Sequence, residues 1–425
     1  MNHMRKVVAL LLVFTVLLGF SWGILAEEAS GTTQDTTVQT TTDPNKVAST
    51  EQYTEEEYQE VVASVNSVAE GTLPEFKANA VMLVEPVTGT VIYEKNADAK
   101  VYPASTTKIM TLILAFEAIN DGKFSMEDEV TTSAYAASIE GSSALLAEGE
   151  VHTLHDLLAA MAVGSANDAA MVVAEYIGGS EEGFIKMMND KAAELGMTGT
   201  HYMNPHGLHD DNHYTTARDM MTLSLYAIDV PQLLDFTSMK EFEFRPDPHK
   251  MLLYNTNKLL FWYEGTDGLK TGTTSPAGRC LLSTVVRDDL RLVGVVMGGT
   301  ERNSHYSESM KLMNYGFSQY TMAEILTPEK ELTAAGIAKG REETVNLMVT
   351  EAVRLPSSKT EDPGYTVEYE VDPDLEAPIE KGEKAGEAVV SLNGEELARV
   401  DLVTAQAVEK QTFWQAIVRS FQNLF

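Results

Sequence analysis

Apolar positions change their period along the chain, and these changes predict the order of its elements. Two short apolar runs at residues 78–84 and 91–93 are separated by a turn that contains Pro and Gly, which is typical of a β-hairpin. Helical periods dominate residues 105–234, and strand-like runs return at 281–286 and 292–297. We therefore expect an α+β domain in which helices pack on one antiparallel sheet assembled from both ends of this segment.

A second, smaller domain is predicted after residues 75–327. Near Pro328 the composition changes, and residues 328–403 alternate short apolar runs with Gly, Pro and charged positions. This pattern is typical of short strands joined by tight turns. Within it, Asn393 and Gly394 are the residue pair that strongly favours a two-residue hairpin turn. We expect a small all-β domain.

The end of the chain, residues 404–425, has the pattern of an amphipathic helix. Its apolar side chains recur at spacings of three and four and therefore share one helical face. That face consists of Phe413, Trp414, Ile417, Val418, Phe421, Leu424 and Phe425. The opposite face is polar, so the segment is suited to lying in a membrane interface rather than crossing a bilayer. A helix docked on its own domain is the alternative interpretation.

The first residues have the three parts of a secretory signal. A basic start, an apolar run and the small residue Ala26 make residues 1–26 a predicted signal peptide, cleaved after Ala26. An uncleaved amino-terminal anchor is the alternative, and either interpretation places the body of the protein outside the cytoplasm. Residues 27–74 are rich in Thr, Gln and Glu, so we expect a disordered linker within which residues 55–68 could form a short helix.

Charge and cysteine content narrow the possible partners. Acidic residues outnumber basic ones by 63 to 31, which gives a formal net charge of -32. Such an acidic surface repels the phosphate groups of nucleic acids, so we expect no nucleic-acid partner. The single cysteine, Cys280, excludes an internal disulfide and a multi-thiolate zinc site. It lies among apolar residues, and we interpret it as a packed strand position rather than a nucleophile.

Three short motifs carry the candidate chemistry. In chain order they are Ser105-Thr106-Thr107-Lys108, Ser165-Ala166-Asn167 and Lys270-Thr271-Gly272. About 60 residues separate the first two, and about 100 separate the last two. Ser105 and Lys108 begin a helix that is apolar nearly all round, and their spacing of three places both side chains on one face within one turn. The amine can therefore reach the hydroxyl.

The residue types in the first two motifs suit acid–base work around a serine nucleophile. A serine hydroxyl needs a base beside it, and a lysine is a base only when it is neutral. Burial of Lys108 and a second cation nearby would both lower its pKa, and Lys270 is the candidate cation. Ser165 follows a helical run on an inter-helix loop, where its hydroxyl can pass a proton to a leaving amine. Asn167 can hydrogen-bond a substrate amide and Lys108.

The third motif has the features of a substrate-binding strand. We expect it on a strand that follows a turn at Asp267-Gly268. There Lys270 and Thr271 offer a positive charge and a hydroxyl group to a terminal carboxylate. Gly272 lets a substrate backbone lie close along the strand.

Two further interpretations of this region follow from its backbone. The N–H groups of Ser105 and Thr273 are placed to form an oxyanion hole. A phosphate-binding loop is disfavoured, because such a loop needs Gly, Lys and Ser or Thr in consecutive positions. Here Leu269 separates Gly268 from Lys270.

A group of histidines with acidic neighbours could suggest a metal site. The group consists of His201, His206, His209, His213, Asp210 and Asp211. Its spacing fits no zinc motif, and acidic loops with histidines are commonly solvated. We expect no metal and no cofactor.

The three motifs together resemble the Ser-x-x-Lys, Ser-x-Asn and Lys-Thr-Gly set of β-lactamases and penicillin-binding proteins. From about residue 75 to 425 the chain is similar to the low-molecular-mass penicillin-binding proteins, the serine-type D-alanyl-D-alanine carboxypeptidases. Other segments that carry this resemblance are Gly141-Ser142-Ser143, Asn204-Pro205-His206-Gly207-Leu208, Thr215-Thr216-Ala217-Arg218-Asp219 and Asp267-Gly268-Leu269.

The resemblance implies a β-lactamase/transpeptidase-like catalytic domain and an acyl-enzyme mechanism. Ser105 would attack the D-Ala-D-Ala bond of a peptidoglycan stem peptide, release D-alanine and be freed by water, and β-lactams would trap it. Lys108 and Ser165 would be the other catalytic residues, and Asn167 and residues 270–273 would bind substrate. We expect an exported enzyme held at the outer leaflet of the cytoplasmic membrane by residues 404–425.

Two other functions are open at this point. A class A serine β-lactamase would need a glutamate in an Ω loop to activate the deacylating water, and no glutamate occurs between Met197 and Tyr214. A non-catalytic peptidoglycan-binding protein on the same scaffold is the second alternative. The intact motif residues and the extra β domain favour the carboxypeptidase.

Overall fold

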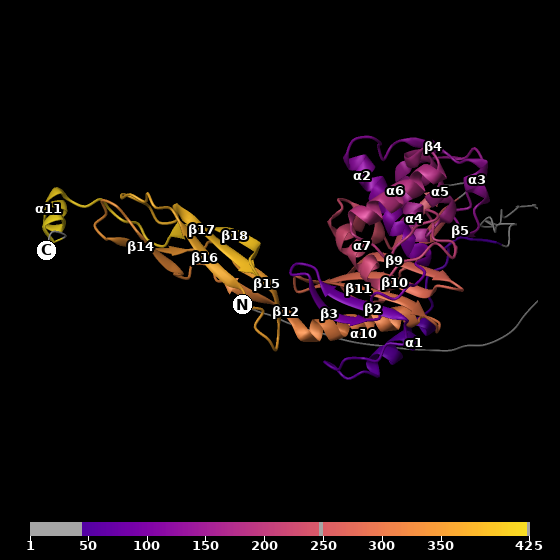
Figure 1. Cartoon of the computed structure of the whole chain (residues 1–425), viewed down its shortest axis with the longest axis horizontal. Coiled ribbons are helices and arrows are strands. Elements are labelled where there is room, and N and C mark those ends of the chain that lie inside the picture. The colour runs from indigo at the N-terminus through magenta and orange to yellow at the C-terminus, as the bar shows by residue number, and fades with distance from the viewer. Residues whose placement is uncertain (1–44, 246–249, 423–425) are drawn as a thin grey trace, which may run out of the picture. The chain divides into compact units, whose positions relative to one another are not determined.

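The computed structural model describes residues 45–245 and 250–422 (Figure 1). The predicted signal peptide and residues 27–44 of the predicted linker lie outside the described residues. No helix in the described part of the chain is long and apolar enough to cross a membrane.

A five-stranded antiparallel sheet is the centre of the larger domain. In spatial order its strands are β3 (Thr90–Lys95), β2 (Ala80–Glu85), β11 (Leu290–Gly299), β10 (Gly278–Arg287) and β9 (Thr266–Thr274). Since β2 and β3 come from the start of the domain and the other three from its end, the predicted sheet is confirmed. Almost every side chain of β2 and β11 is buried, which requires cover on both faces.

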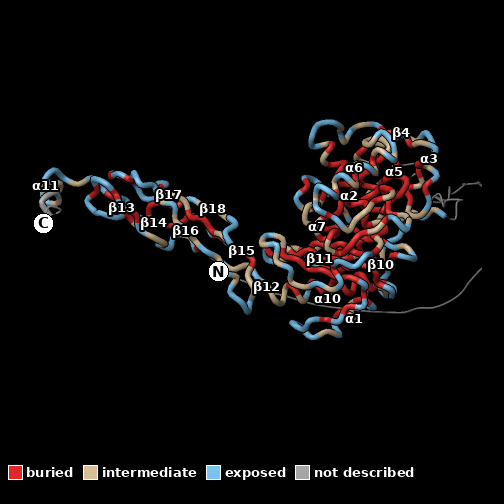
Figure 2. Tube along the Cα trace, in the orientation of Figure 1, coloured by how far each residue is buried: buried red, intermediate tan, exposed pale blue. Residues whose placement is uncertain are grey.

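Helices supply this cover on both faces of the sheet (Figure 1), and Figure 2 shows buried residues in the strands and in the helices that cover them. One face carries a helical layer made of η1 (Ala104–Thr107), α2 (Lys108–Asn120), α3 (Ala134–Ser138), α4 (Leu154–Gly164), α5 (Asn167–Gly178), α6 (Glu181–Glu194), α7 (Ala217–Asp229) and α8 (Leu233–Thr237). The other face shares its core with α1 (Glu55–Asn66), α9 (Leu259–Trp262) and α10 (Ser304–Gln319).

Helix α2 lies inside the helical layer. Every residue from Lys108 to Phe116 is buried, as expected for a helix whose side chains are apolar all round. The amine of Lys108 therefore has no contact with bulk water, and the sequence prediction of a buried helix is confirmed.

Three short strand pairs complete the larger domain. They are β1 (Lys46–Val47) with β5 (Gly141–Ser142), β4 (Glu129–Thr131) with β6 (Val151–Thr153), and β7 (Glu241–Arg245) with β8 (Met251–Tyr254). The first pair is parallel, and the other two are antiparallel.

Residues 45–66 are ordered in the structure, so the prediction of a disordered linker is wrong for this part, whereas the short helix expected within residues 55–68 is present as α1. Thr54 and Glu57 form a capping box at the start of α1, and Val61 and Val65 are buried in the core shared with α10. The low apolar content misled the prediction. Two buried valines join this helix to a core that other elements supply, and ion pairs of Glu57 with Lys258 and Arg302 add to its attachment.

The second domain is all β, as predicted. Its main sheet has the order β13 (Thr333–Gly336), β14 (Thr344–Met348), β18 (Glu395–Thr404), β17 (Lys384–Leu392) and β16 (Thr366–Val371), and beside it β12 (Tyr320–Leu326) pairs with β15 (Val353–Ser358). Asn393 and Gly394 join β17 to β18 with φ values of 53° and 85°, so the predicted hairpin turn is confirmed. Because β12 pairs within this domain, its β structure begins at Tyr320, before the predicted boundary at 328.

The last helix, α11 (Phe413–Gln422), is shorter than predicted. Residues 404–412 are extended: Val408 bridges to Ile379, and Lys410 bridges to Gly340. The amphipathic period therefore begins only at Phe413, and residues 423–425 lie outside the described residues. Backbone pairing with the β domain holds the preceding segment out of the helix.

Candidate active site

Ser105 and Lys108 come together because the chain turns from η1 directly into α2. The Lys108 Nζ atom lies 3.1 Å from Ser105 Oγ. It also donates hydrogen bonds of 2.7 Å to Asn167 Oδ1 and of 2.7 Å to the His206 carbonyl oxygen. The structure thus brings the first two predicted motifs together, and the predicted contact between Asn167 and Lys108 is present.

Two glycines let other segments approach the turn that carries Ser105. Gly207 has a φ of +89°, and a Cβ atom there would lie 1.9 Å from the Ala104 carbonyl oxygen. A Cβ atom at Gly272 would lie 2.8 Å from the Ser105 backbone nitrogen. Strand β9 therefore passes directly beside the Ser105 N–H group, and an oxyanion hole shared by Ser105 and Thr273 would need such a close approach.

Burial and a neighbouring charge both favour the neutral form of Lys108. Desolvation lowers the pKa of Lys108 well below its ordinary value, the positive charge of Lys270 lowers it further, and the carboxylate of Asp168 opposes both. Lys108 is fully buried. A neutral amine has two hydrogens, which the oxygens of Asn167 and His206 accept, so its lone pair is left for the Ser105 hydroxyl proton.

This arrangement predicts how the pH dependence of acylation responds to Lys270→Gln. Removing the positive charge raises the pKa of Lys108, so the acid limb of the rate of acylation by a penicillin moves to higher pH. The effect is confined to pH values below about 7, because burial lowers the pKa of Lys270 itself to about 7. Stopped-flow acylation rates between pH 5 and 9 measure it, with Lys186→Gln on exposed α6 as the control. A limb that stays in place or moves to lower pH would contradict this electrostatic coupling.

The second motif lies between two helices, as predicted. Ser165 has a left-handed conformation, with φ of 59°, after the end of α4, and it is nearly buried. Asn167 begins α5, and its Nδ2 atom donates a 2.6 Å hydrogen bond to the Glu140 carbonyl oxygen. The amide is thereby fixed with its oxygen toward Lys108. Ser165 and Ser105 line the same cleft.

The third motif lies on β9, at the edge of the sheet. Lys270 Nζ is 3.2 Å from Thr256 Oγ1, and Thr271 Oγ1 donates a 2.8 Å hydrogen bond to the same atom. Asp267 and Gly268 lie within β9, so the turn predicted at these residues comes earlier in the chain. The strand begins sooner because Thr266 and Gly268 pair with β10.

A cleft of about 350 Å³ connects the motifs. Its walls include Ser105, Ser142, Ser165, Thr271, Gly272 and Thr273 together with Thr256, Arg279, Arg302 and His305. Arg279 lies opposite Thr273 in the sheet register. Within the described residues its guanidinium group has no ion-pair partner, so it adds an uncompensated positive charge to the cleft, which suits a negatively charged ligand.

Sequence reasoning missed several residues of this cleft. Thr256 holds two residues of the third motif, yet it belongs to no recognised pattern. Arg279 could have been found from the hairpin register between β9 and β10, which places it opposite Thr273. Ser49 and Tyr53 lie in a segment that was predicted to be disordered, and they also line the cleft.

His213 of the histidine group and Cys280 are both buried, and their contacts are those of packed structural residues. His213 Nε2 lies 2.9 Å from Thr107 Oγ1, and burial lowers the pKa of His213 to about 3, so its ring is neutral. Among the residues that the structure describes, no three His, Cys, Asp or Glu side chains are arranged to hold a metal ion. Cys280 is buried on β10, and desolvation raises the pKa of its thiol to about 12, which suits packing rather than nucleophilic attack.

Two family models match the chain. The model described as D-alanyl-D-alanine carboxypeptidase matches residues 66–301. The model described as the C-terminal domain of penicillin-binding protein 5 matches residues 320–410.

Known proteins of this kind are similar over most of their length. The D-alanyl-D-alanine carboxypeptidase DacF of Bacillus subtilis is 35% identical over 339 residues, which cover 79% of this chain and 87% of that protein. The structure of penicillin-binding protein 5 from Haemophilus influenzae is 31% identical, with a TM-score of 0.60 over 80% of this chain and 99% of that chain. Penicillin-binding protein D2 from Listeria monocytogenes, solved in its ampicillin-bound form, is 30% identical, with a TM-score of 0.51 over 58% of this chain and 99% of that chain.

Proposed function

The chain belongs to the family of serine-type D-alanyl-D-alanine carboxypeptidases, and we propose that it removes the terminal D-alanine of peptidoglycan stem pentapeptides through an acyl-enzyme on Ser105. The observation that carries this proposal is the buried Lys108 amine, held by Asn167 and the His206 carbonyl oxygen at 3.1 Å from Ser105 Oγ. A neutral amine in that position is the base that a serine nucleophile needs.

Acylation is a nucleophilic substitution at the carbonyl carbon of the penultimate D-alanine. Lys108 takes the hydroxyl proton as Ser105 Oγ forms the ester bond, and the N–H groups of Ser105 and Thr273 stabilise the oxyanion. The carbon–nitrogen bond then breaks, and Lys108 gives its proton through Ser165 to the leaving amine of the terminal D-alanine, which returns Lys108 to its neutral form. Lys270 and Thr271, supported by Arg279, hold the terminal carboxylate.

Deacylation reverses these roles with water as the nucleophile. Water adds to the ester carbonyl as its proton passes to Lys108, and Lys108 then returns a proton to Ser105 Oγ as the Ser105–acyl bond breaks and the shortened peptide is released. A β-lactam forms the same ester but keeps its leaving group attached, so a long-lived adduct follows.

The two alternative functions are not favoured. The carboxypeptidase family model and the C-terminal domain model together match most of the described chain. A β-lactamase would turn over penicillin instead of retaining it, and a binding protein would not react with it.

The proposal is tested by following free D-alanine from a soluble stem pentapeptide that ends in D-Ala-D-Ala. The chain is expected to release one D-alanine per peptide and none from the corresponding tetrapeptide. Release from neither peptide, in a sample that forms a penicillin adduct, would overturn the carboxypeptidase activity.

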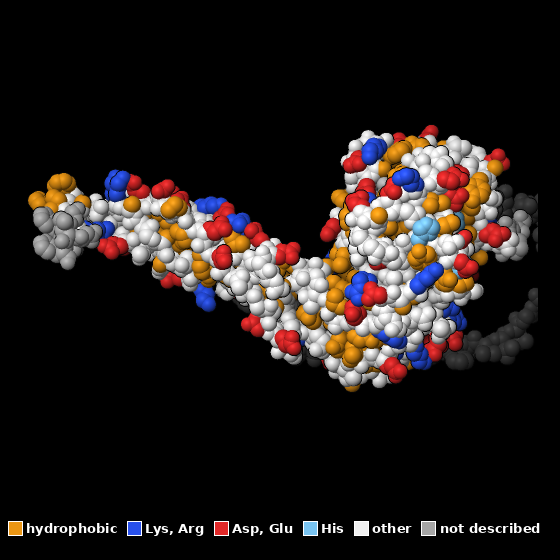
Figure 3. Space-filling view, in the orientation of Figure 1, with side chains coloured by type: hydrophobic (Ala, Val, Ile, Leu, Met, Phe, Trp, Pro, Cys, Tyr) orange, Lys and Arg blue, Asp and Glu red, His pale blue; other side chains and the backbone are white. Residues whose placement is uncertain are grey.

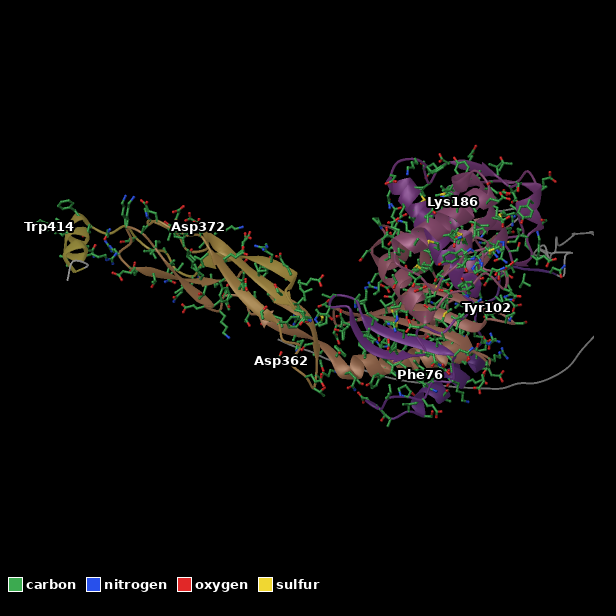
Figure 4. All side chains as sticks on the ribbon, in the orientation of Figure 1. Phe76, Tyr102, Lys186, Asp362, Asp372 and Trp414 are labelled. Carbon is green, nitrogen blue, oxygen red and sulfur yellow. The ribbon has the colours of Figure 1, made fainter. Side chains whose placement is uncertain are left out.

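The substrate lies in the cell wall, so the catalytic domain acts outside the cytoplasm, and we propose that α11 attaches it to the outer leaflet of the cytoplasmic membrane. Phe413, Trp414 and Val418 have exposed fractions of 75%, 74% and 55%; Trp414 is labelled in Figure 4, and Figure 3 shows apolar side chains on this helix. Arg419 instead donates to the carbonyl oxygens of Gly340 and Arg341. Since the net charge is -32, apolar insertion rather than charge attraction would supply the binding.

A vesicle-binding experiment gives the corresponding prediction. Trp414→Glu removes one large apolar side chain and adds a charge, so co-sedimentation with phosphatidylglycerol and phosphatidylethanolamine vesicles should weaken by roughly tenfold or more. Gln59→Glu on α1 adds the same charge and is expected to change nothing. Equal binding of both variants would contradict attachment through α11.

A further inference from the structure

The segment of residues 45–53, here named the strap, crosses from one wall of the active-site cleft to the other. At its start, β1 pairs with β5: the N–H groups of Gly141 and Ser143 donate hydrogen bonds of 2.7 Å and 2.8 Å to the carbonyl oxygens of Asn45 and Val47. The residue before Gly141 accepts the hydrogen bond of the Asn167 amide. The strap therefore begins beside the wall that carries Ser165 and Asn167.

The strap then attaches to the opposite wall, on β8 and α9. Ser49 makes two hydrogen bonds with Tyr254: its carbonyl oxygen accepts from the Tyr254 N–H group at 2.8 Å, and its Oγ atom donates to the Tyr254 carbonyl oxygen at 2.9 Å. The Tyr53 ring packs against Phe261 and Trp262, with ring centroids 5.5 Å and 5.3 Å apart. This wall leads to Thr256, which holds Lys270 and Thr271.

Helix α1 anchors the far end of the strap. The Glu57 carboxylate pairs with Lys258 at 2.7 Å and with Arg302 at 2.8 Å. Although burial opposes it, hydrogen bonds from Lys258, Thr54 and Arg302 lower the pKa of Glu57 to about 2, so the carboxylate is charged at neutral pH. Both cationic partners belong to the cleft wall, and the end of the strap is therefore fixed to the site itself.

The position of the strap relative to the chemistry decides what it can do. Ser49, Glu51, Gln52 and Tyr53 line the cleft together with Thr256, Arg302 and His305. This is the side of Ser105 on which Lys270 and Thr271 are proposed to hold the terminal carboxylate. The strap therefore bounds the cleft at the end where the leaving group lies.

We propose that the strap determines exopeptidase specificity by closing the leaving-group end of the cleft, so that only a single terminal residue fits beyond the scissile bond. This inference rests on the proposed function, because it assumes that the leaving D-alanine lies between Ser105 and the strap. The carboxypeptidase family model begins at residue 66, so the strap lies outside the part of the chain that it matches.

The chemistry explains why such a wall separates two classes of substrate. In a pentapeptide the leaving amine belongs to one D-alanine, whose carboxylate ends the chain. In a cross-linked dimer the same D-alanyl carbonyl is bonded to an amine on the side chain of a second stem peptide, and this whole peptide leaves when the carbon–nitrogen bond breaks. The bond made to Ser105 Oγ and the proton transfers are unchanged, so discrimination depends on space at the leaving-group end.

The experiment compares the two substrates in the full chain. In one variant, residues 45–53 are replaced by a Gly/Ser sequence of the same length. In a second variant, Ser49→Ala and Tyr53→Ala remove the side-chain anchors only, and Glu60→Gln on the exposed face of α1 is the matched control. Each protein is given a pentapeptide and, separately, a soluble cross-linked peptide dimer, and the ratio of kcat/KM values is measured beside stoichiometric penicillin labelling of Ser105.

The expected result is that both strap variants still label with penicillin and that their dimer-to-pentapeptide ratio rises roughly tenfold or more, a change of the size of one excluded group. The control keeps the wild-type ratio. An unchanged ratio in a variant that labels fully would overturn the role of the strap. A wild-type chain that releases no D-alanine would instead overturn the proposed function, and with it this inference. If the Gly/Ser variant does not fold, the ratio of the Ser49→Ala, Tyr53→Ala variant decides.

Discussion

Ser105→Ala is expected to abolish D-alanine release, with a loss in kcat of roughly 10⁴-fold or more. The variant has no side-chain oxygen that can form the ester. Hydrolysis would therefore depend on direct attack by water, without an acyl-enzyme intermediate. The fold should persist, because within the described residues the hydrogen bond of the Ser105 hydroxyl is the one with the Lys108 amine, and the buried side chains of α2 are unchanged. Release of D-alanine and the thermal midpoint of unfolding measure the two effects.

Ser67→Ala is the matched control, since this hydroxyl lies at the exposed end of α1 and donates only to the Ser64 carbonyl oxygen. It should keep wild-type activity. D-alanine release by Ser105→Ala at even a few per cent of the wild-type rate would mean that another residue is the nucleophile.

Lys108→Met is expected to slow acylation by roughly 10³-fold. The methionine side chain fills the buried volume but cannot accept the Ser105 proton. Removing the amine leaves the Asn167 Oδ1 atom and the His206 carbonyl oxygen without their buried donor, so the melting temperature should fall modestly while the fold persists. The rate constant of penicillin acylation and a thermal melt measure these effects.

The pH dependence of the wild type follows from the same residue. Lys108 acts only when neutral, so acylation should rise as pH increases through its lowered pKa and level off above it. Lys108→Arg is the informative companion, because a guanidinium stays charged at every accessible pH. Activity of Lys108→Arg near the wild-type level would contradict Lys108 as the base.

The motif residues could be predicted because their relative positions depend on neighbouring residues in one helix or one strand. A spacing of three in a helix places Ser105 and Lys108 on one face whatever the rest of the fold does. The effect of burial on Lys108 could also be read from the apolar run around it. What the sequence could not supply was the approach of His206 to the same amine, since it depends on a loop whose backbone, not its side chain, makes the contact.

The strap escaped prediction for a related reason. Its contacts to Gly141, Ser143 and Tyr254 are largely hydrogen bonds of the backbone, and these leave no trace in hydropathy. One readable signal was present: Thr54 and Glu57 have the spacing of a capping box, which predicts the start of a helix. The extended residues 404–412 were likewise misread, because their pairing partners lie far away in the sequence.

The most direct test of the acyl-enzyme is the mass of the full chain after it is mixed with benzylpenicillin. We predict a stable increase of one penicilloyl group, which peptide mapping assigns to the peptide that contains Ser105 and which is absent in Ser105→Ala. An adduct on any other residue, or hydrolysis of penicillin without an adduct, would contradict the account.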